Sequence, residues 1–189
     1  LGENLEIREE DGLRMLSKQE RGTQFFPKNI LSVRDTAEWN NIVFRVRYRL
    51  PEKSALILVV KKNGRRSEIP YMQYYVGIRP DGISLQCHGI PPEGASITPA
   101  DPRVNSMVKF SDTGEAPLVE TEWIAVKVRV GQEALQVLAS TDDGETRKVE
   151  FKTLPGTGGV SILAHSPVDV ASASVHSADG EVVASEKLE

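Results

Sequence analysis

The chain has 189 residues and a formal net charge of −4, with 39% hydrophobic and 26% charged residues. This composition excludes wholesale disorder, and the mildly acidic balance argues against a nucleic-acid-binding domain, which would be clearly basic. No run of about 18 apolar residues occurs, so no membrane span is predicted.

A period of two runs from Ile42 to Leu50. One face of this stretch carries apolar side chains only, and the opposite face carries Val43 and then an arginine at every second position. The arginines are Arg45, Arg47 and Arg49. Such alternation predicts a half-buried strand with a basic outer face. The stretch from Trp123 to Val130 repeats the pattern, with Lys127 and Arg129 facing outward.

Other short strands follow, separated by glycine, proline and aspartate turns. They are predicted at 55–61, 71–79, 83–88, 134–140, 146–151, 160–164 and 168–177, with weaker candidates at 12–17 and 30–34. Pro80-Asp81-Gly82 predicts a tight hairpin. Residues 89–102 hold four prolines and are predicted to be a long loop, and no amphipathic helix longer than two turns is predicted.

About a dozen short strands with this punctuation predict an all-β fold, an antiparallel two-sheet β-sandwich of jelly-roll type. The predicted core residues are Phe44, Val46, Tyr48, Val126, Val128, Val137 and Ile162. We expect residues 1–187 to form a single domain taken from a larger protein, and the final Leu188-Glu189 resembles a cloning remnant.

The sole cysteine, Cys87, lies in an alternating strand, which predicts a small buried hydrophobe. With one cysteine, no internal disulfide and no multi-cysteine zinc site can form. Trp123 is expected to be moderately buried packing rather than a platform for a ligand, since large aromatic side chains seldom stay fully exposed to water.

From Asn41 onward, the layout resembles the concanavalin A-like lectin and glucanase superfamily. The likeness is greatest to laminin G-like domains and to the 3-keto-disaccharide hydrolase family of jelly rolls. The stretches that carry it are Val43–Arg47, Tyr74–Ile78, Gly82–Leu85, Trp123–Val128, Leu135–Val137 and Gly158–Ile162.

The resemblance implies a non-catalytic carbohydrate-binding or carbohydrate-associated module of an exported bacterial protein. Its partner would be a glycan or polysaccharide, and its location extracellular or periplasmic. Two alternatives stay open, namely a glycoside-cleaving jelly-roll enzyme and a laminin G-like domain that binds a protein.

Catalytic residues are not predicted. Retaining glycoside hydrolysis needs two carboxylates about 5 Å apart, and the Glu-x-Asp-x-x-Glu strand of the laminarinase-type members is missing from this sequence. The acidic residues near the N-terminus lack that spacing, and we interpret them as a solvated stretch. They are Glu6, Glu9, Glu10 and Asp11.

Residues 140–146 match the Asp-box pattern S-x-D-x-G-x-T. The pattern predicts a hairpin in which Asp142 accepts backbone N–H bonds and Gly144 supplies a positive φ. No cofactor is expected, although Asp142 and Asp143 could hold a structural calcium ion, because hard cations prefer clustered oxygens. The three histidines, His88, His165 and His176, show no spacing typical of a metal site.

The predicted ligand-binding residues come from two polar faces. Arg45 and Arg47 lie on the arginine ladder, whereas Tyr75, Gln86 and His88 lie on the predicted hairpin. We expect the concave side of a sheet to collect all five. Aromatic planes and multidentate donors together suit a sugar, and guanidinium groups suit an anionic sugar in particular.

Overall fold

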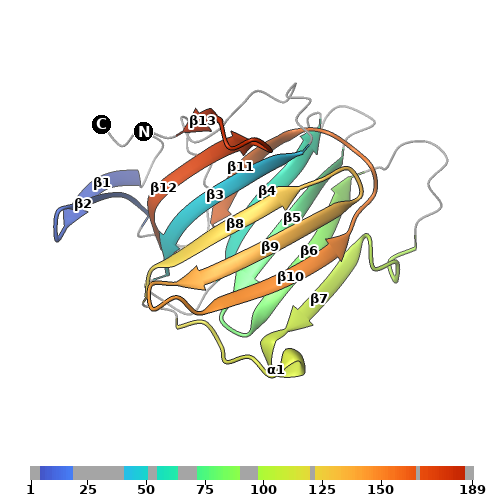
Figure 1. The fold of residues 1–189 in the computed structure, drawn as a ribbon, viewed down its shortest axis with the longest axis horizontal. Coiled ribbons are helices and arrows are strands. Elements are labelled where there is room, and N and C mark those ends of the chain that lie inside the picture. Colours follow the sequence, from blue (N-terminus) through green and yellow to red (C-terminus); the bar gives the residue numbers. More distant parts are fainter. Residues whose placement is uncertain are drawn as a thin grey trace.

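The computed structural model describes residues 5–18, 41–50, 55–63, 72–89, 98–119, 122–164 and 167–185. In this part of the chain, strands from two antiparallel sheets pack face to face (Figure 1). The predicted antiparallel β-sandwich is therefore confirmed. Among the described residues no helix has the length and the apolar character needed to cross a membrane.

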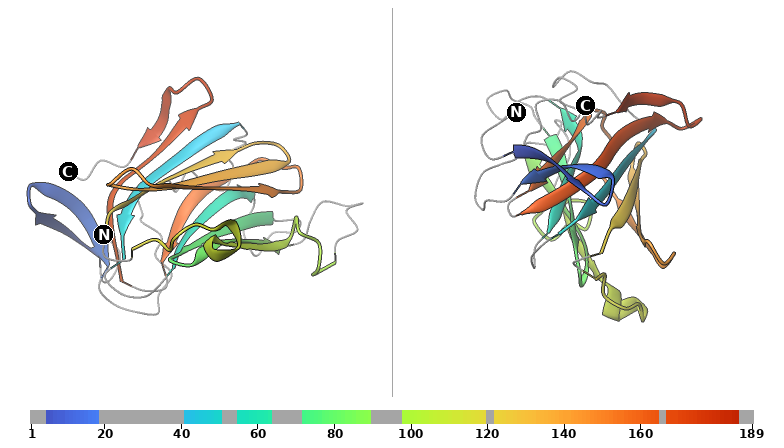
Figure 2. Two further views of the ribbon diagram at one scale, coloured as in Figure 1. Left: turned by 60° about the horizontal axis from the view of Figure 1, so that its bottom comes forward. Right: turned by 90° about the vertical axis from the view of Figure 1, so that its left-hand side faces the viewer.

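Sheet A has eight strands. Seven follow the spatial order β1-β2-β12-β3-β8-β9-β10, and β13 pairs with β12. Their bounds are β1 Leu5–Glu10, β2 Leu13–Lys18, β3 Ile42–Arg49, β8 Ile124–Val130, β9 Ala134–Thr141, β10 Thr146–Lys152, β12 Val168–Ser177 and β13 Val182–Ser185. Two hairpins, β1–β2 and β12–β13, extend from the sandwich at one edge of this sheet (Figure 2).

Sheet B has five strands in the order β11-β4-β5-β6-β7. Their bounds are β4 Leu56–Asn63, β5 Met72–Arg79, β6 Gly82–Gly89, β7 Asn105–Lys109 and β11 Gly159–Ala164, and the short helix α1, Phe110–Thr113, follows β7. The predicted Pro80-Asp81-Gly82 hairpin joins β5 to β6. Gly82 is required there, because a Cβ atom would lie 2.4 Å from the carbonyl oxygen of Val108 on β7.

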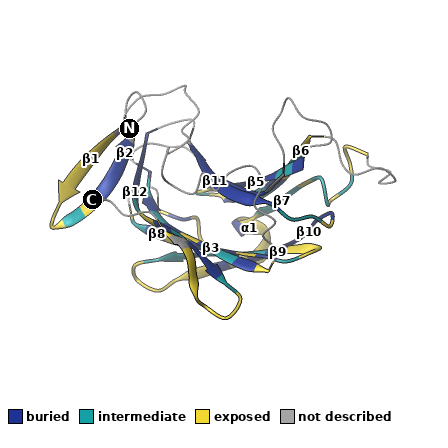
Figure 3. Cartoon of the chain, turned by 90° about the horizontal axis from the view of Figure 1, so that it is seen from above, coloured by how far each residue is buried: buried dark blue, intermediate teal, exposed yellow. Residues whose placement is uncertain are grey.

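The inward side chains of both sheets form one core, as alternation predicts. All seven predicted core residues are buried, from Phe44 on β3 to Ile162 on β11. Figure 3 shows the buried residues between the sheets and sheet A curving around sheet B. The outer face of sheet A is therefore convex, and the outer face of sheet B is concave.

Three strands and the helix were not predicted. β1 has four charged residues among six, β7 has two adjacent apolar residues, Met107 and Val108, and β13 is four residues long, so none of the three shows a sustained period of two. The weak candidate at 30–34, residues 90–97 of the predicted loop and His165 all lie outside the described residues.

Lys61 connects the two sheets through hydrogen bonds. A bulge in β4 and a φ of +50° turn its side chain inward, and the residue is fully buried. Its Nζ donates to Gln132 O at 2.5 Å, Thr153 Oγ1 at 2.8 Å and Leu154 O at 3.0 Å, all in segments beside sheet A. Burial lowers the pKa of Lys61 to about 8.

A buried carboxylate attaches the β1–β2 hairpin. Asp169 on β12 accepts hydrogen bonds from Ser17 on β2 and from Arg49 on β3. Arg49 also donates two hydrogen bonds of 2.9 Å to the carboxylate of Glu10. The Arg49 guanidinium holds the pKa of Glu10 below its usual range. One arginine therefore joins β1, β3 and β12.

Candidate functional site

The five predicted ligand-binding residues lie on two opposite outer faces. Arg45 and Arg47 project from β3 on the outer face of sheet A. Tyr75 on β5, with Gln86 and His88 on β6, projects from the outer face of sheet B. The expectation that all five share one face is corrected, because the chain crosses from sheet A to sheet B between β3 and β4.

The outer face of sheet B carries a stacked pair of rings. The centroids of Tyr75 and His88 lie 4.1 Å apart, with 27° between the ring planes. Tyr75 is directly opposite Gln86, and His88 is directly opposite Gln73. Gln73 Nε2 donates to Tyr75 Oη at 3.0 Å. We call these four residues the ring cluster.

The strands of sheet B contain no acidic residue. Neither Asp nor Glu occurs in β4, β5, β6, β7 or β11. The strands that carry the ring cluster therefore provide no carboxylate pair of the kind that glycoside hydrolysis uses.

The outer face of sheet A has a different chemistry, because long cations dominate it. Arg47 Nη2 donates to Asp142 at 3.0 Å, and the guanidinium carbons of Arg47 and Arg49 lie 5.4 and 5.0 Å from the centre of the Trp123 ring. Trp123 is half-buried beneath them, as expected of packing. Cation–π contacts of this kind stabilise a fold without any ligand.

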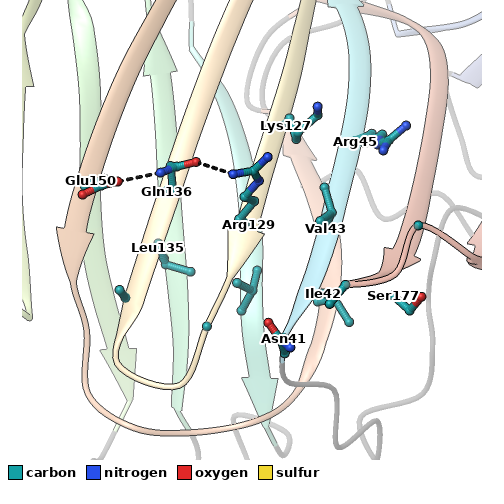
Figure 4. A pocket seen from close by; sticks show the side chains of 15 residues that line it. Asn41, Ile42, Val43, Arg45, Lys127, Arg129, Leu135, Gln136, Glu150 and Ser177 are labelled. Atoms are coloured by element: carbon teal, nitrogen blue, oxygen red, sulfur yellow. Dashed lines mark hydrogen bonds between the residues drawn. The ribbon is translucent and has the colours of Figure 1, made fainter.

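Two shallow depressions of about 450 and 430 Å³ lie side by side on this face. The larger extends from Arg45 to the β8–β9 and β12–β13 turns (Figure 4). The smaller has Leu138 and Ala125 among its lining residues, together with hydroxyl-bearing side chains. Arg45 and Lys127 line both depressions.

A chain of hydrogen bonds crosses the larger depression. Arg129 Nη1 donates to Gln136 Oε1 at 3.1 Å, and Gln136 Nε2 donates to Glu150 Oε1 at 2.5 Å; both bonds are drawn in Figure 4. Lys148 Nζ lies 3.3 Å from the same Glu150 oxygen. The neighbouring Gln136 and Lys148 hold the pKa of Glu150 below its usual range.

The Asp-box pattern forms the predicted β9–β10 hairpin, with Gly144 at a φ of +90°. Asp143, rather than Asp142, accepts the turn's backbone N–H, from Glu145, and also the Thr141 hydroxyl. Asp142 instead pairs with Arg47. The assignment of the backbone bond to Asp142 was wrong, because adjacent residues of a turn point in different directions.

Among the described residues, no group of three or more His, Cys, Asp and Glu side chains is close enough together to hold a metal ion. His88 lies on sheet B and His176 on sheet A, so these two do not converge. Cys87 packs against the core as a half-buried residue, and burial raises the pKa of its thiol.

The predicted ligand-binding residues did not include Lys127, Arg129 or Gln73. Alternation had already placed Lys127 and Arg129 outward, but it could not show that β8 pairs with β3 and brings Lys127 directly opposite Arg45. Gln73 is two residues from Tyr75 on the same strand, so alternation alone could have placed it on the face that carries the ring cluster.

No protein-family model matches the sequence, and no curated protein matches it. Among solved structures, the marine PL-14 alginate lyase from Aplysia kurodai is similar at a TM-score of 0.57 and 8% identity, over 92% of this chain and 87% of that chain.

Two further structures are similar at lower scores. The carbohydrate-binding module CBM66 from Bacillus subtilis matches at a TM-score of 0.49 and 8% identity, over 89% of this chain and 84% of its own. The galectin LEC-6 from Caenorhabditis elegans matches at 0.48 and 11% identity, over 80% and 94%.

Proposed function

We propose that the chain is a non-catalytic carbohydrate-binding module that holds a sugar on the outer face of sheet B. Its structural neighbours are concanavalin A-like jelly rolls, and the shared fold by itself assigns no activity. The observation that carries this proposal is the stacked Tyr75–His88 pair beside Gln73 and Gln86.

The ring cluster offers what an uncharged sugar needs. The C–H face of a sugar ring packs on an aromatic side chain, and amide groups can donate to and accept from its hydroxyls. The Gln73 hydrogen bond to Tyr75 Oη fixes the tyrosine, and ring stacking fixes His88, so little side-chain entropy is lost on binding. The concave curvature of the sheet lets neighbouring strands contact a bound chain from both sides.

The two alternatives have less support. A glycoside-cleaving enzyme would need carboxylates that the strands of sheet B do not carry. A protein-binding face would show a contiguous apolar patch, whereas the exposed large hydrophobic residues among the described residues are spread over several elements. These are Ile7 on β1, Met107 on β7, Val119 after α1, and Val182 and Val183 on β13.

The test is a glycan array, followed by titration of the best ligand against variants. We expect Tyr75→Ala to weaken binding at least about tenfold, the loss expected for one aromatic contact. Tyr75→Phe keeps the ring and should retain most of the affinity. Gln136→Ala, on the outer face of sheet A, is the control and should bind as the unmodified protein does.

Equal affinities of Tyr75→Ala and Gln136→Ala, with both variants folded, would remove the ring cluster from consideration. An array without any hit would contradict the proposed function as a whole. A location outside the cytoplasm belongs to the same proposal, and an export signal in the translated product of the whole gene is its test.

A further inference from the structure

Cross-strand register places cations in one row on the outer face of sheet A. Arg45 on β3 is directly opposite Lys127 on β8, and Lys127 is opposite Leu138 on β9, which is opposite Lys148 on β10. On the other side of Arg45 the row continues to Ser174 on β12. The row holds three cations and no acid.

The other cations nearby have acidic or amide partners. Arg47 pairs with Asp142, Arg49 with Glu10 and Asp169, and Lys148 with Glu150, while Arg129 donates to Gln136. Among the described residues, the side chains of Arg45 and Lys127 have neither a hydrogen bond nor an ion pair. We call these two residues the cation pair.

Folding alone does not account for the cation pair. Like charges directly opposite each other on a sheet destabilise it, and the protein as a whole is acidic, with a net charge of −4. The two cations therefore do not reflect a general excess of basic residues. They are also the residues that line both depressions.

We propose that the cation pair binds the carboxylate or sulfate group of an acidic polysaccharide. Arg45 is exposed and Lys127 half-buried, so one anionic group between them can accept charge-assisted hydrogen bonds from both. The smaller depression continues from this point with an apolar floor, Leu138 and Ala125, and with the hydroxyls of Ser140, Thr146 and Ser172. Those groups suit the sugar that bears the anion.

The flanking acids favour a polysaccharide over a nucleic acid. Asp142 lies beyond the cation pair on one side and Glu150 on the other, each paired with a cation of this face. A nucleic acid carries a charge at every nucleotide and would meet these carboxylates, whereas a sugar polymer can place uncharged units there. This site uses other residues on the opposite face from the ring cluster, and it stands or fails independently of the proposed function.

The experiment uses three probes with one backbone, namely dextran, carboxymethyl dextran and dextran sulfate, each as short fractionated oligomers. We expect the two charged oligomers to bind and dextran not to bind. The stronger of the two charged oligomers identifies the anion as carboxylate or sulfate. Affinity should fall as salt is added, because the cations are close to solvent.

The test variant is Arg45→Gln/Lys127→Gln, and the matched control is Arg8→Gln/Arg14→Gln, which removes two exposed cations from the β1–β2 hairpin of the same sheet. The test variant should lose at least about tenfold in affinity, as expected when two charge-assisted contacts are removed. The control should change by less than about twofold, since distant exposed charges are largely screened. Thermal unfolding verifies that both variants fold.

Equal losses in the two double variants, or no binding of either charged oligomer, would overturn the proposal. Tighter binding of a single-stranded oligonucleotide than of both charged dextrans would overturn the assigned ligand class. In contrast, Tyr75→Ala should leave charged-dextran binding unchanged, and this result separates the cation pair from the ring cluster.

Discussion

The outer faces of the two sheets arise from the same alternation of residues but differ in chemistry. Sheet A presents long cations, and three of them, Arg47, Arg49 and Lys148, pair with acids; Arg49 joins strands and a hairpin through Asp169 and Glu10. Sheet B presents rings and amides, with no acid in its strands. The comparison shows that the cations of one face can serve the fold by pairing with acids, whereas the face whose strands lack acids is the one on which we propose a sugar site.

The two faces also differ in how much of each is covered. On sheet B, Val59 of β4 and Leu163 of β11 occupy outward positions, yet both are buried. The polar half of that face, at β5 and β6, therefore holds the ring cluster. On sheet A the open region lies at β3, β8 and β9, around the cation pair.

The largest effect on stability is expected at Lys61, a residue of sheet B that donates hydrogen bonds to segments beside sheet A. Lys61→Met leaves buried acceptors near sheet A without their donor, and we expect a loss of about 3 kcal/mol in the free energy of unfolding. Urea denaturation measures it. The matched control is Lys127→Met, which removes an unpaired, half-buried lysine and should change stability by less than about 0.5 kcal/mol. Similar losses in both variants would show that Lys61 does not join the sheets.

A smaller effect is expected at Asp169, which holds the charged edge of sheet A. Asp169→Asn removes the charge that Arg49 and Ser17 contact, and the expected cost is about 2 kcal/mol, as for the loss of a hydrogen bond to a charged group. Because Ser17 lies on β2, amide hydrogen exchange should accelerate most in 5–18. Unchanged exchange in that hairpin, with faster exchange in β8 and β9, would contradict the assigned role.

The pH dependence of stability separates Lys61 from the exposed cations. Burial lowers its pKa to about 8 in the folded protein, so between pH 8 and about 10.4 the unfolded chain binds more protons. Stability therefore rises with pH across this window. Relative to Lys61→Met, the unmodified protein should gain on the order of 1 kcal/mol from pH 8 to 10. A falling difference would mean that the three oxygens stabilise the ammonium.

The sequence could predict the face of each residue but not the sheet. Alternation assigned Phe44 inward and Arg45 outward, and the structure agrees. It could not predict that β3 and β5 belong to different sheets, because pairing depends on contacts between distant segments. For the same reason the five predicted ligand residues were joined into one site. Lys61 is the last residue of the predicted strand at 55–61, and no local pattern indicates a bulge that turns it inward.

The smallest expected effect tests the cation pair in the absence of any ligand. Arg45 and Lys127 are directly opposite each other and have no acidic partner among the described residues. The repulsion between their two positive charges therefore destabilises the folded protein. Replacing one by glutamine removes this repulsion and keeps most of the packing of the stem. We therefore expect Arg45→Gln to stabilise the protein by about 0.3 kcal/mol. Chemical denaturation at low salt can resolve this gain with replicates, and the gain should diminish as salt screens the pair.

Arg47→Gln is the matched control: it loses the Asp142 pair and should be neutral or slightly destabilising. A protein that is more stable without Arg45 but binds charged oligomers less tightly would show that this residue serves binding at a cost to the fold. A loss of stability in Arg45→Gln equal to that in Arg47→Gln would instead mean that Arg45 has a stabilising role and that the two arginines of the ladder are equivalent.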